Sequence, residues 1–212
     1  IQLAIESGAP GEAIAAARRA LELQPRQGWL LKLVYDLEIR LRDWDAAEKT
    51  LRRAVRAGVI PAGQALSDRV AMALARADAA AEKGEAEQAL REIRAACALD
   101  PAFVPAAARL AEIEFGQGRR RRALARIERA WKANPHPDLV VLWEKAAPEK
   151  ARSQAAPRMK WFQRLVDLRP QSEEGYLALA RVAMECQLWG DARFALEQVG
   201  KIRPCPRLFR LA

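Results

Sequence analysis

One pattern of residues occurs twice in this chain: VAMALARADAAAEKGEAEQALREIRAACALDP from Val70 to Pro101, and VPAAARLAEIEFGQGRRRRALARIERAWKANP from Val104 to Pro135. Every matching residue recurs after 34 positions, and the matches are Gly84 with Gly118, Ala89 with Ala123, Ile93 with Ile127, Ala96 with Ala130 and Pro101 with Pro135. The spacing of the apolar residues predicts two helices on either side of each glycine. A proline then ends the second helix.

This period, with a glycine at the mid-repeat turn, small alanines at the helix crossing and a closing proline, resembles the tetratricopeptide repeat (TPR). The resemblance implies an all-α fold, a right-handed α-solenoid of about five and a half helical hairpins, in which each hairpin buries its apolar face against its neighbours. We expect one continuous superhelix over residues 1–212, with repeats at 1–25 (partial), 26–59, 68–101, 102–135, 136–170 and 171–204, and a truncated further helix at 205–212.

Several positions depart from the pattern. Arg42 stands where a turn glycine is expected, and Val59 stands where a closing proline is expected. About eight extra residues, Ile60–Ser67, predict either a loop or a lengthened helix start, with Asp68 as the N-cap. Asp138 is expected to cap a helix over 139–147, and the structure of residues 149–157 stays open. Because the chain starts at Ile1 with an incomplete repeat, we expect it to be an excised fragment.

Composition narrows the class of protein. Apolar residues make up 51% of the 212 residues and charged residues 30%, which is typical of a folded chain. The net charge of +9 is uneven: residues 1–101 hold 15 Lys/Arg and 15 Asp/Glu, whereas residues 102–212 hold 21 and 12. The three cysteines lie far apart and form no C-x-x-C pair, which disfavours a disulfide framework or a zinc site.

The sequence contains no catalytic constellation. It has one histidine and lacks the G-x-G-x-x-G, P-loop, G-x-S-x-G and H-E-x-x-H motifs. We therefore predict that the protein is not an enzyme and needs no cofactor or metal. The single histidine, His136, lies between two prolines in a turn; it is either an ordinary turn residue or a haem ligand.

The densest charge run, Arg119-Arg120-Arg121-Arg122 followed by Arg126, has two interpretations. It is either a solvated turn and outer helix face, or a basic patch for an acidic protein or an anionic membrane surface. Nucleic acid is a weaker partner because few aromatic residues accompany the arginines.

The repeat register also predicts a concave groove lined by the first helix of each hairpin. Its expected partner-binding residues are Lys32, Asp36, Asp78, Glu112, Phe115 and Arg181. Asp36, Asp78 and Glu112 occupy the same place in three repeats and would form an acidic row, while Arg181 reverses the charge at the far end. Such a groove could orient a charged peptide or helix, or it could be a solvated surface that binds nothing.

Further stretches in the second half are AWKANPHPDL from Ala130 to Leu139, RLVDLRP from Arg164 to Pro170, ALAR from Ala178 to Arg181 and WGDAR from Trp189 to Arg193. They resemble the C-terminal TPR region of the proteobacterial HemY family. That resemblance implies a membrane-anchored protein associated with haem biosynthesis, without an established catalytic site. The anchor would lie upstream of Ile1, at the bacterial inner membrane, and the TPR region would be cytoplasmic.

Together these observations predict a non-catalytic scaffold that binds protein partners. The resemblance to the HemY family implies that these partners include enzymes of haem biosynthesis. Two alternatives stay open: a haem or porphyrin carrier that uses His136, and a TPR adaptor unrelated to haem. The sequence alone leaves the oligomeric state open.

Overall fold

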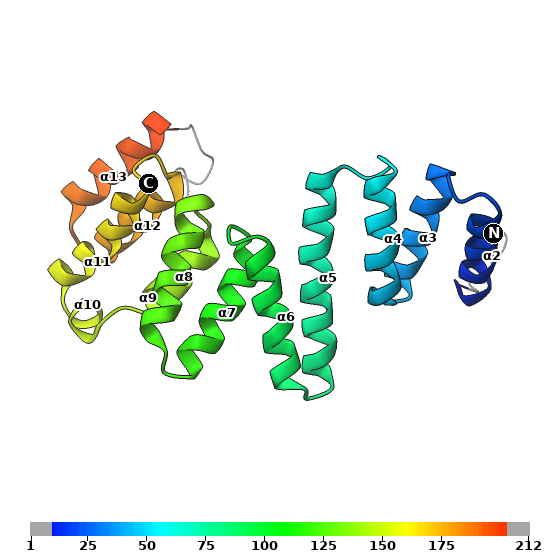
Figure 1. Ribbon diagram of the computed structural model, residues 1–212. Coiled ribbons are helices and arrows are strands. Elements are labelled where there is room, and N and C mark those ends of the chain that lie inside the picture. Colours follow the sequence, from blue (N-terminus) through cyan, green and yellow to red (C-terminus); the bar gives the residue numbers. More distant parts are fainter. Residues whose placement is uncertain (1–9, 203–212) are drawn as a thin grey trace. The chain divides into compact units, whose positions relative to one another are not determined.

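The computed structural model describes residues 10–202, and every regular element in that range is a helix. The helices pair into antiparallel hairpins of the tetratricopeptide type, which confirms the all-α class (Figure 1). The chain divides into two compact units, residues 1–99 and 100–212. One continuous right-handed superhelix across both units stays a prediction. The predicted helix at 205–212 lies outside the described residues.

The first unit contains five helices within the described range. They are α2 (Pro10–Leu23), α3 (Gly28–Arg40), α4 (Trp44–Arg56), α5 (Ala62–Glu82) and α6 (Ala86–Leu99). Successive helices pack on one another: α2 on α3, α3 on α4, α4 on α5, and α5 on α6. Leu30, Leu31, Val34 and Leu51 are almost fully buried among them.

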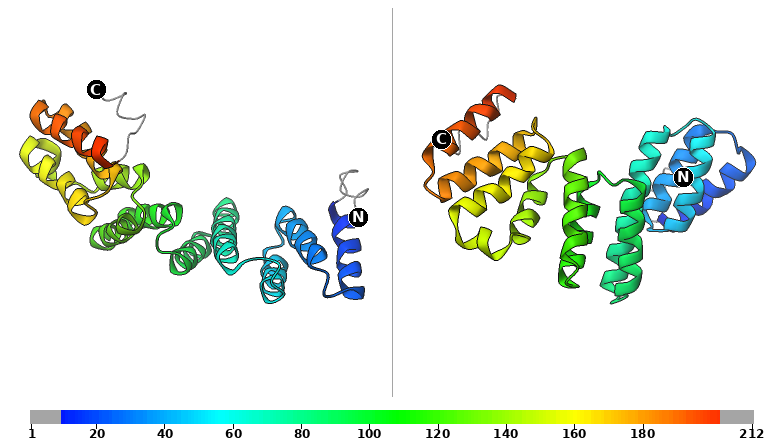
Figure 2. Two further views of the ribbon diagram at one scale, coloured as in Figure 1. Left: turned by 90° about the horizontal axis from the view of Figure 1, so that it is seen from above. Right: turned by 60° about the vertical axis from the view of Figure 1, so that its left-hand side comes forward.

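The second unit contains seven helices within the described range: α7 (Val104–Gly116), α8 (Arg120–Ala133), α9 (Pro137–Lys145), α10 (Glu149–Ser153), α11 (Ala155–Leu168), α12 (Glu173–Glu185) and α13 (Trp189–Ile202). Figure 2 shows α12 and α13, the last coloured helices, side by side in both views. The residues 149–157, left open by the sequence, form α10 and the first turn of α11.

The alanines at the hairpin crossings are buried, as the repeat pattern predicts. Ala47, Ala54, Ala96, Ala123 and Ala130 all have an exposed fraction of 0%. A larger side chain at these positions would separate the two helices, because protein interiors are packed at crystal-like density. Cys97 is buried next to Ala96 on the same helix.

Four hairpins turn through the same backbone conformation. A residue with positive φ follows the first helix in each: Arg42 (56°), Gly84 (76°), Gly118 (71°) and Gln187 (58°). In each turn its N–H donates to the carbonyl three residues earlier, and the next N–H donates to the carbonyl five residues earlier. This is the Schellman motif, which normally selects glycine. Arg42 therefore adopts the glycine conformation without being glycine.

The eight-residue insertion is a lengthened helix rather than a loop. Helix α5 starts at Ala62, directly after Pro61, so the prediction of Asp68 as an N-cap is wrong. Asp68 instead lies inside the helix, where its carboxylate accepts a hydrogen bond from the Tyr35 hydroxyl. Proline ahead of the first turn fits a helix start because its fixed φ is suited to entering a helix and the first N–H groups have no partner inside the helix.

A reciprocal tryptophan pair joins α9 to α11 across the short helix α10. The rings of Trp143 and Trp161 stack with centroids 4.5 Å apart. Each indole N–H donates to the other residue's carbonyl oxygen at 3.0 Å. The Arg164 guanidinium lies over both rings, at 5.1 and 4.8 Å from their centroids. This pair holds the least regular repeat together.

The turn conformation leads to a stability prediction. Glycine has no Cβ, so placing it in the left-handed conformation removes about 1–2 kcal/mol of backbone strain. The greater freedom of glycine in the unfolded chain offsets about 0.5–1 kcal/mol of this gain. We expect Arg42→Gly and Gln187→Gly to raise the urea midpoint slightly, and Gly118→Ala to lower stability by about 1 kcal/mol. No atom lies within 4 Å of the Cβ that Gly118→Ala adds, so no steric clash contributes to the loss of stability.

Chemical denaturation followed by circular dichroism measures this effect. Gly63→Ala serves as the control because Gly63 lies inside α5 with ordinary φ and open space around it. That change should stabilise the helix by up to about 1 kcal/mol. If Gly118→Ala behaved like Gly63→Ala, the turn would not require the left-handed conformation.

Candidate functional site

A groove in the first unit lies between α3 and α5, the first helices of two successive hairpins. We call it the α3–α5 groove; its volume is about 520 Å³, and it is lined by Tyr35, Asp36, Ile39, Arg40, Trp44, Gln64, Asp68, Ala71, Met72 and Ala75. Of the predicted groove residues, Asp36 belongs to this lining. Lys32 is exposed one turn earlier on α3, and Asp78 is exposed further along α5.

Tyr35 and Asp68 connect the two walls of this groove. The Tyr35 hydroxyl donates to Asp68 Oδ2 at 3.0 Å. Burial, together with this hydrogen bond and the nearby carboxylates, raises the pKa of Tyr35 well above its ordinary value. A tyrosine hydroxyl is already protonated at neutral pH, and the upward shift keeps it a donor to still higher pH.

Asp36 supplies a charge that the groove does not neutralise. Its carboxylate is exposed and forms no ion pair within residues 10–202. Around it lie the apolar side chains of Ile39, Trp44 and Met72. An exposed carboxylate beside apolar surface can bind a segment that carries both a basic and an apolar side chain.

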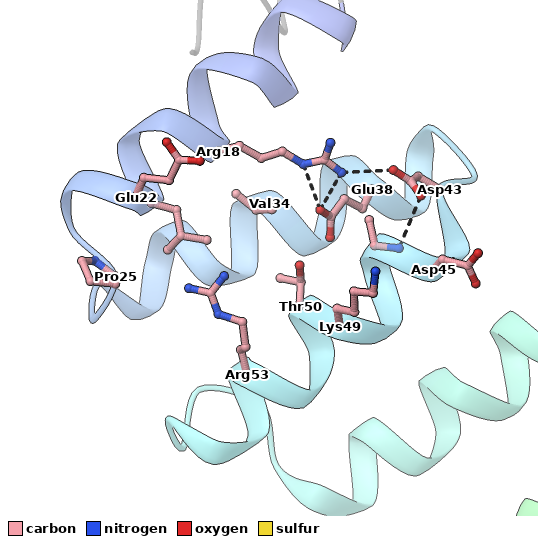
Figure 3. A pocket seen from close by; sticks show the side chains of 12 residues that line it. Arg18, Glu22, Pro25, Val34, Glu38, Asp43, Asp45, Lys49, Thr50 and Arg53 are labelled. Carbon is pink, nitrogen blue, oxygen red and sulfur yellow. Dashed lines mark hydrogen bonds and ion pairs between the residues drawn. The ribbon is translucent and has the colours of Figure 1, made fainter.

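A second groove, the α2–α4 groove, lies on a different face of α3. It has a volume of about 550 Å³ and is shown in Figure 3. Arg18 on α2 donates to Glu38 Oε1 at 2.9 and 3.2 Å and to Asp43 Oδ2 at 3.1 Å. Glu38 is 2% exposed, and its Oε2 has no hydrogen-bond partner. Two carboxylates thus share one guanidinium, which holds α2 against α3.

In the second unit, the predicted groove charges are already paired. Glu112 lies 3.7 Å from the Lys145 ammonium, and Arg181 contacts Glu144 at 2.9 Å and Glu185 at 3.5 Å. Phe115 packs against the core and is half-buried. Because Asp36 and Asp78 belong to the first unit and Glu112 to the second, the continuous acidic row stays a prediction.

Arg181 is one of four side chains in a closed ring of ion pairs. Arg158 contacts Glu144 at 2.7 Å and Glu185 at 2.6 Å, so each arginine contacts both glutamates. Partial burial opposes ionisation of Glu144, but the guanidinium groups of Arg181 and Arg158 outweigh it and lower the pKa of Glu144. The ring joins α9, α11 and α12, which gives Arg181 a structural role.

The arginine run divides into structural and exposed members. Arg120 donates to the Ala146 carbonyl at the end of α9, and Arg126 pairs with Glu114, which is 6% exposed, at 3.1 Å. Arg119 precedes α8 and is exposed, as are Arg121 and Arg122. Arg120 and Arg126 thus already contact groups within the chain, and a basic patch built from all five arginines stays a prediction. Arg119, Arg121 and Arg122 are the members for which no ion pair is seen within residues 10–202.

His136 is the N-cap of α9. Its Nδ1 accepts a hydrogen bond from the Asp138 backbone N–H at 3.2 Å. The predicted cap, Asp138, lies instead in the first turn of the helix, where a carboxylate interacts favourably with the helix dipole. This hydrogen bond gives His136 a local structural role, and haem ligation stays a prediction.

Residues 10–202 lack two kinds of feature. No group of three or more His, Cys, Asp or Glu side chains within residues 10–202 is arranged to hold a metal ion. Over the same range, no helix is both long and apolar enough to cross a membrane.

Sequence reasoning missed both buried glutamates. Glu38 and Glu114 lie 76 positions apart, which is two periods of 34 plus about eight inserted residues. The available signal was a glutamate flanked by apolar residues at the same helix position of two repeats, with Ala80 at that position in the repeat between them. It indicates a carboxylate paired inside the protein, because a buried charge needs a partner.

The chain is similar to a probable magnetosome protein. The chain is 29% identical over 170 residues to the probable magnetosome protein Mms48 of Magnetospirillum gryphiswaldense, covering 80% of this chain and 37% of that protein. The chain thus spans little more than a third of its relative's length. No protein-family model matches the chain.

Among solved structures, the chain is similar to a tetratricopeptide repeat protein from Parabacteroides merdae and to yeast Tom70. The first is 16% identical with a TM-score of 0.40, and the match covers 98% of this chain and 79% of that one. Tom70 is 14% identical with a TM-score of 0.44, and the match covers 94% and 41%.

The ring around Arg181 predicts a pH dependence. A carboxylate whose pKa is lowered by folding stabilises the fold above its unfolded pKa, and this stability is lost as the pH falls through the folded value. We expect the thermal midpoint of the native protein to fall more steeply than that of Glu144→Gln between about pH 5 and pH 3. Glu144→Gln should be the less stable protein at neutral pH.

Thermal melts monitored by circular dichroism test this prediction. Glu112→Gln is the matched control, since Glu112 is exposed and its ion pair with Lys145 is long, at 3.7 Å. It should follow the native profile. Parallel profiles for native protein and Glu144→Gln would mean that the ring contributes no pH-dependent stability.

Proposed function

We propose that this chain is a non-catalytic scaffold that binds a protein partner through the α3–α5 groove. The observation that carries the proposal is an exposed carboxylate, Asp36, which forms no ion pair within residues 10–202 and shares the groove lining with the apolar side chains of Ile39, Trp44 and Met72. Elsewhere in the first unit, acidic residues such as Glu38 and Glu48 are paired with arginines. The unpaired charge is therefore available to a partner.

The groove chemistry defines the class of partner. The carboxylates of Asp36 and Asp68 outnumber the single guanidinium of Arg40 in the lining. A segment with a lysine or arginine next to an apolar side chain would match this surface. The hydrogen bond between Tyr35 and Asp68 holds the two walls in place, so little ordering is required on binding.

A finer proposal places the scaffold in haem biosynthesis. It is supported by the resemblance of residues 130–139, 164–170, 178–181 and 189–193 to the HemY family. In this version an anchor upstream of Ile1 holds the protein at the bacterial inner membrane, and the partners are enzymes of the haem pathway. The similarity to Mms48, a probable magnetosome protein, favours a second version, in which the scaffold serves a magnetosome assembly.

Affinity capture from a membrane-containing bacterial extract tests the proposal. We expect the native protein to retain specific partners, and Asp36→Lys to lose them because it reverses the unpaired charge. Asp36→Asn should give an intermediate result. The control is Glu82→Lys, which reverses an exposed carboxylate at the end of α5, outside the groove lining.

Mass spectrometry of the retained proteins distinguishes the versions. Haem-pathway enzymes among the Asp36-dependent partners would support the HemY-like version, and magnetosome proteins would support the other. Equal retention by native protein and Asp36→Lys would show that the α3–α5 groove is not the binding site.

A further inference from the structure

The insertion ahead of the third repeat builds a third groove, on another face of α5. We call it the α4–α5 groove; it has a volume of about 350 Å³ and is lined by Leu51, Arg52, Val55, Arg56, Ala62, Ala65, Leu66 and Arg69. Ala62, Ala65 and Leu66 all come from the inserted residues. A hairpin of ordinary length would start near Asp68 and would lack this wall.

The surface between the two walls is apolar. Leu51 and Ala65 are buried, Val55 is half-buried, and the Leu66 side chain is left 40% exposed at the edge. An exposed leucine beside a continuous apolar floor is surface that a partner can remove from water, at about 25 cal/mol for each Å². A single exposed leucine is common on protein surfaces and does not by itself indicate a binding site. The charged side chains around the groove are therefore the more informative feature.

The rim of the groove is basic and incompletely neutralised. The lining contains three arginines and no carboxylate. Arg52 and Arg69 both donate to one oxygen, Oε1 of Glu48, at distances of 2.8 to 3.0 Å. Arg56 is exposed and has no ion pair within the described part of the chain. The groove and Glu48 together therefore carry a net charge of about +2.

We propose that the α4–α5 groove docks an amphipathic helix of a partner protein, with apolar side chains on the groove floor and aspartate or glutamate against Arg56 and its neighbours. Two helices that form a surface groove provide the geometry for a third helix to lay an apolar ridge between them. Arg52 and Arg69 share one carboxylate oxygen, and Arg56 has no ion pair within residues 10–202. Carboxylates on the docked helix would accept hydrogen bonds from these guanidinium groups.

This second docking surface differs from the α3–α5 groove in position and in sign. Helix α5 presents Gln64, Asp68 and Met72 to one groove, and Ala62, Leu66 and Arg69 to the other. The first groove is acidic and the second is basic. One helix therefore offers two partners of opposite charge separate places to bind.

Fluorescence anisotropy with a synthetic probe tests the inference. The probe is a stapled helical peptide of about 18 residues, or five turns, with leucine on one face and glutamate on the other. Its twin carries lysine in place of glutamate. We expect the glutamate peptide to bind with an affinity that falls as salt is raised, and the lysine peptide to bind at least about tenfold more weakly.

Two variants test the location of the binding site. Arg56→Glu should weaken binding of the glutamate peptide by about tenfold, and Leu66→Ser by several-fold. The matched control is Arg53→Glu, the same change of charge in the same last turn of α4. Arg53 lines the α2–α4 groove and not the α4–α5 groove. It should bind like the native protein, and circular dichroism should show the same helix content in all variants.

Three results would overturn the inference. These are equal binding of the glutamate and lysine peptides, equal weakening by Arg53→Glu and Arg56→Glu, and no effect of Leu66→Ser. Sedimentation of the protein alone supplies a further check. Dimerisation that Leu66→Ser abolishes would assign the groove to a second copy of the chain instead of a partner helix.

Discussion

Close crossing of paired helices is the constraint on which the rest of this structure depends. Alanine is completely buried at the crossings, for example at Ala47, Ala123 and Ala130, because the backbones approach too closely for a larger side chain. The close approach requires a short turn, and four turns meet that requirement with one residue in the left-handed conformation. Tight hairpins then leave the outer faces of their helices for contacts with neighbours and partners.

The α3–α5 and α4–α5 grooves of the first unit arise where this regularity is interrupted. The insertion lengthens α5 at its start, so one helix lines both the acidic α3–α5 groove and the basic α4–α5 groove. Charge separates them further, since carboxylates outnumber arginines in the α3–α5 groove and the α4–α5 groove is lined by arginines alone; within residues 10–202, Asp36 and Arg56 form no ion pair. In the second unit the corresponding charges, such as Arg181, are used to hold helices together.

The periodic features could be predicted from the sequence, and the contacts between distant positions could not. The turn at Gly118 follows from the 34-residue period, whereas the same turn at Gln187 does not follow from its residue type. A run of arginines looks uniform in sequence, but Arg126 is held by a buried glutamate twelve positions earlier. The pairing of Trp143 with Trp161 depends on how α10 folds, and no repeat match connects these residues.

Hydrogen exchange of the chain with and without its captured partner tests the central claim most directly, because amide protection maps a binding surface without any substitution. Our account predicts added protection along α3 and along the turns of α5 that contain Asp68 and Met72, with little change in α8. Protection confined to α8, around Arg121 and Arg122, would contradict it and would assign partner binding to the exposed arginines.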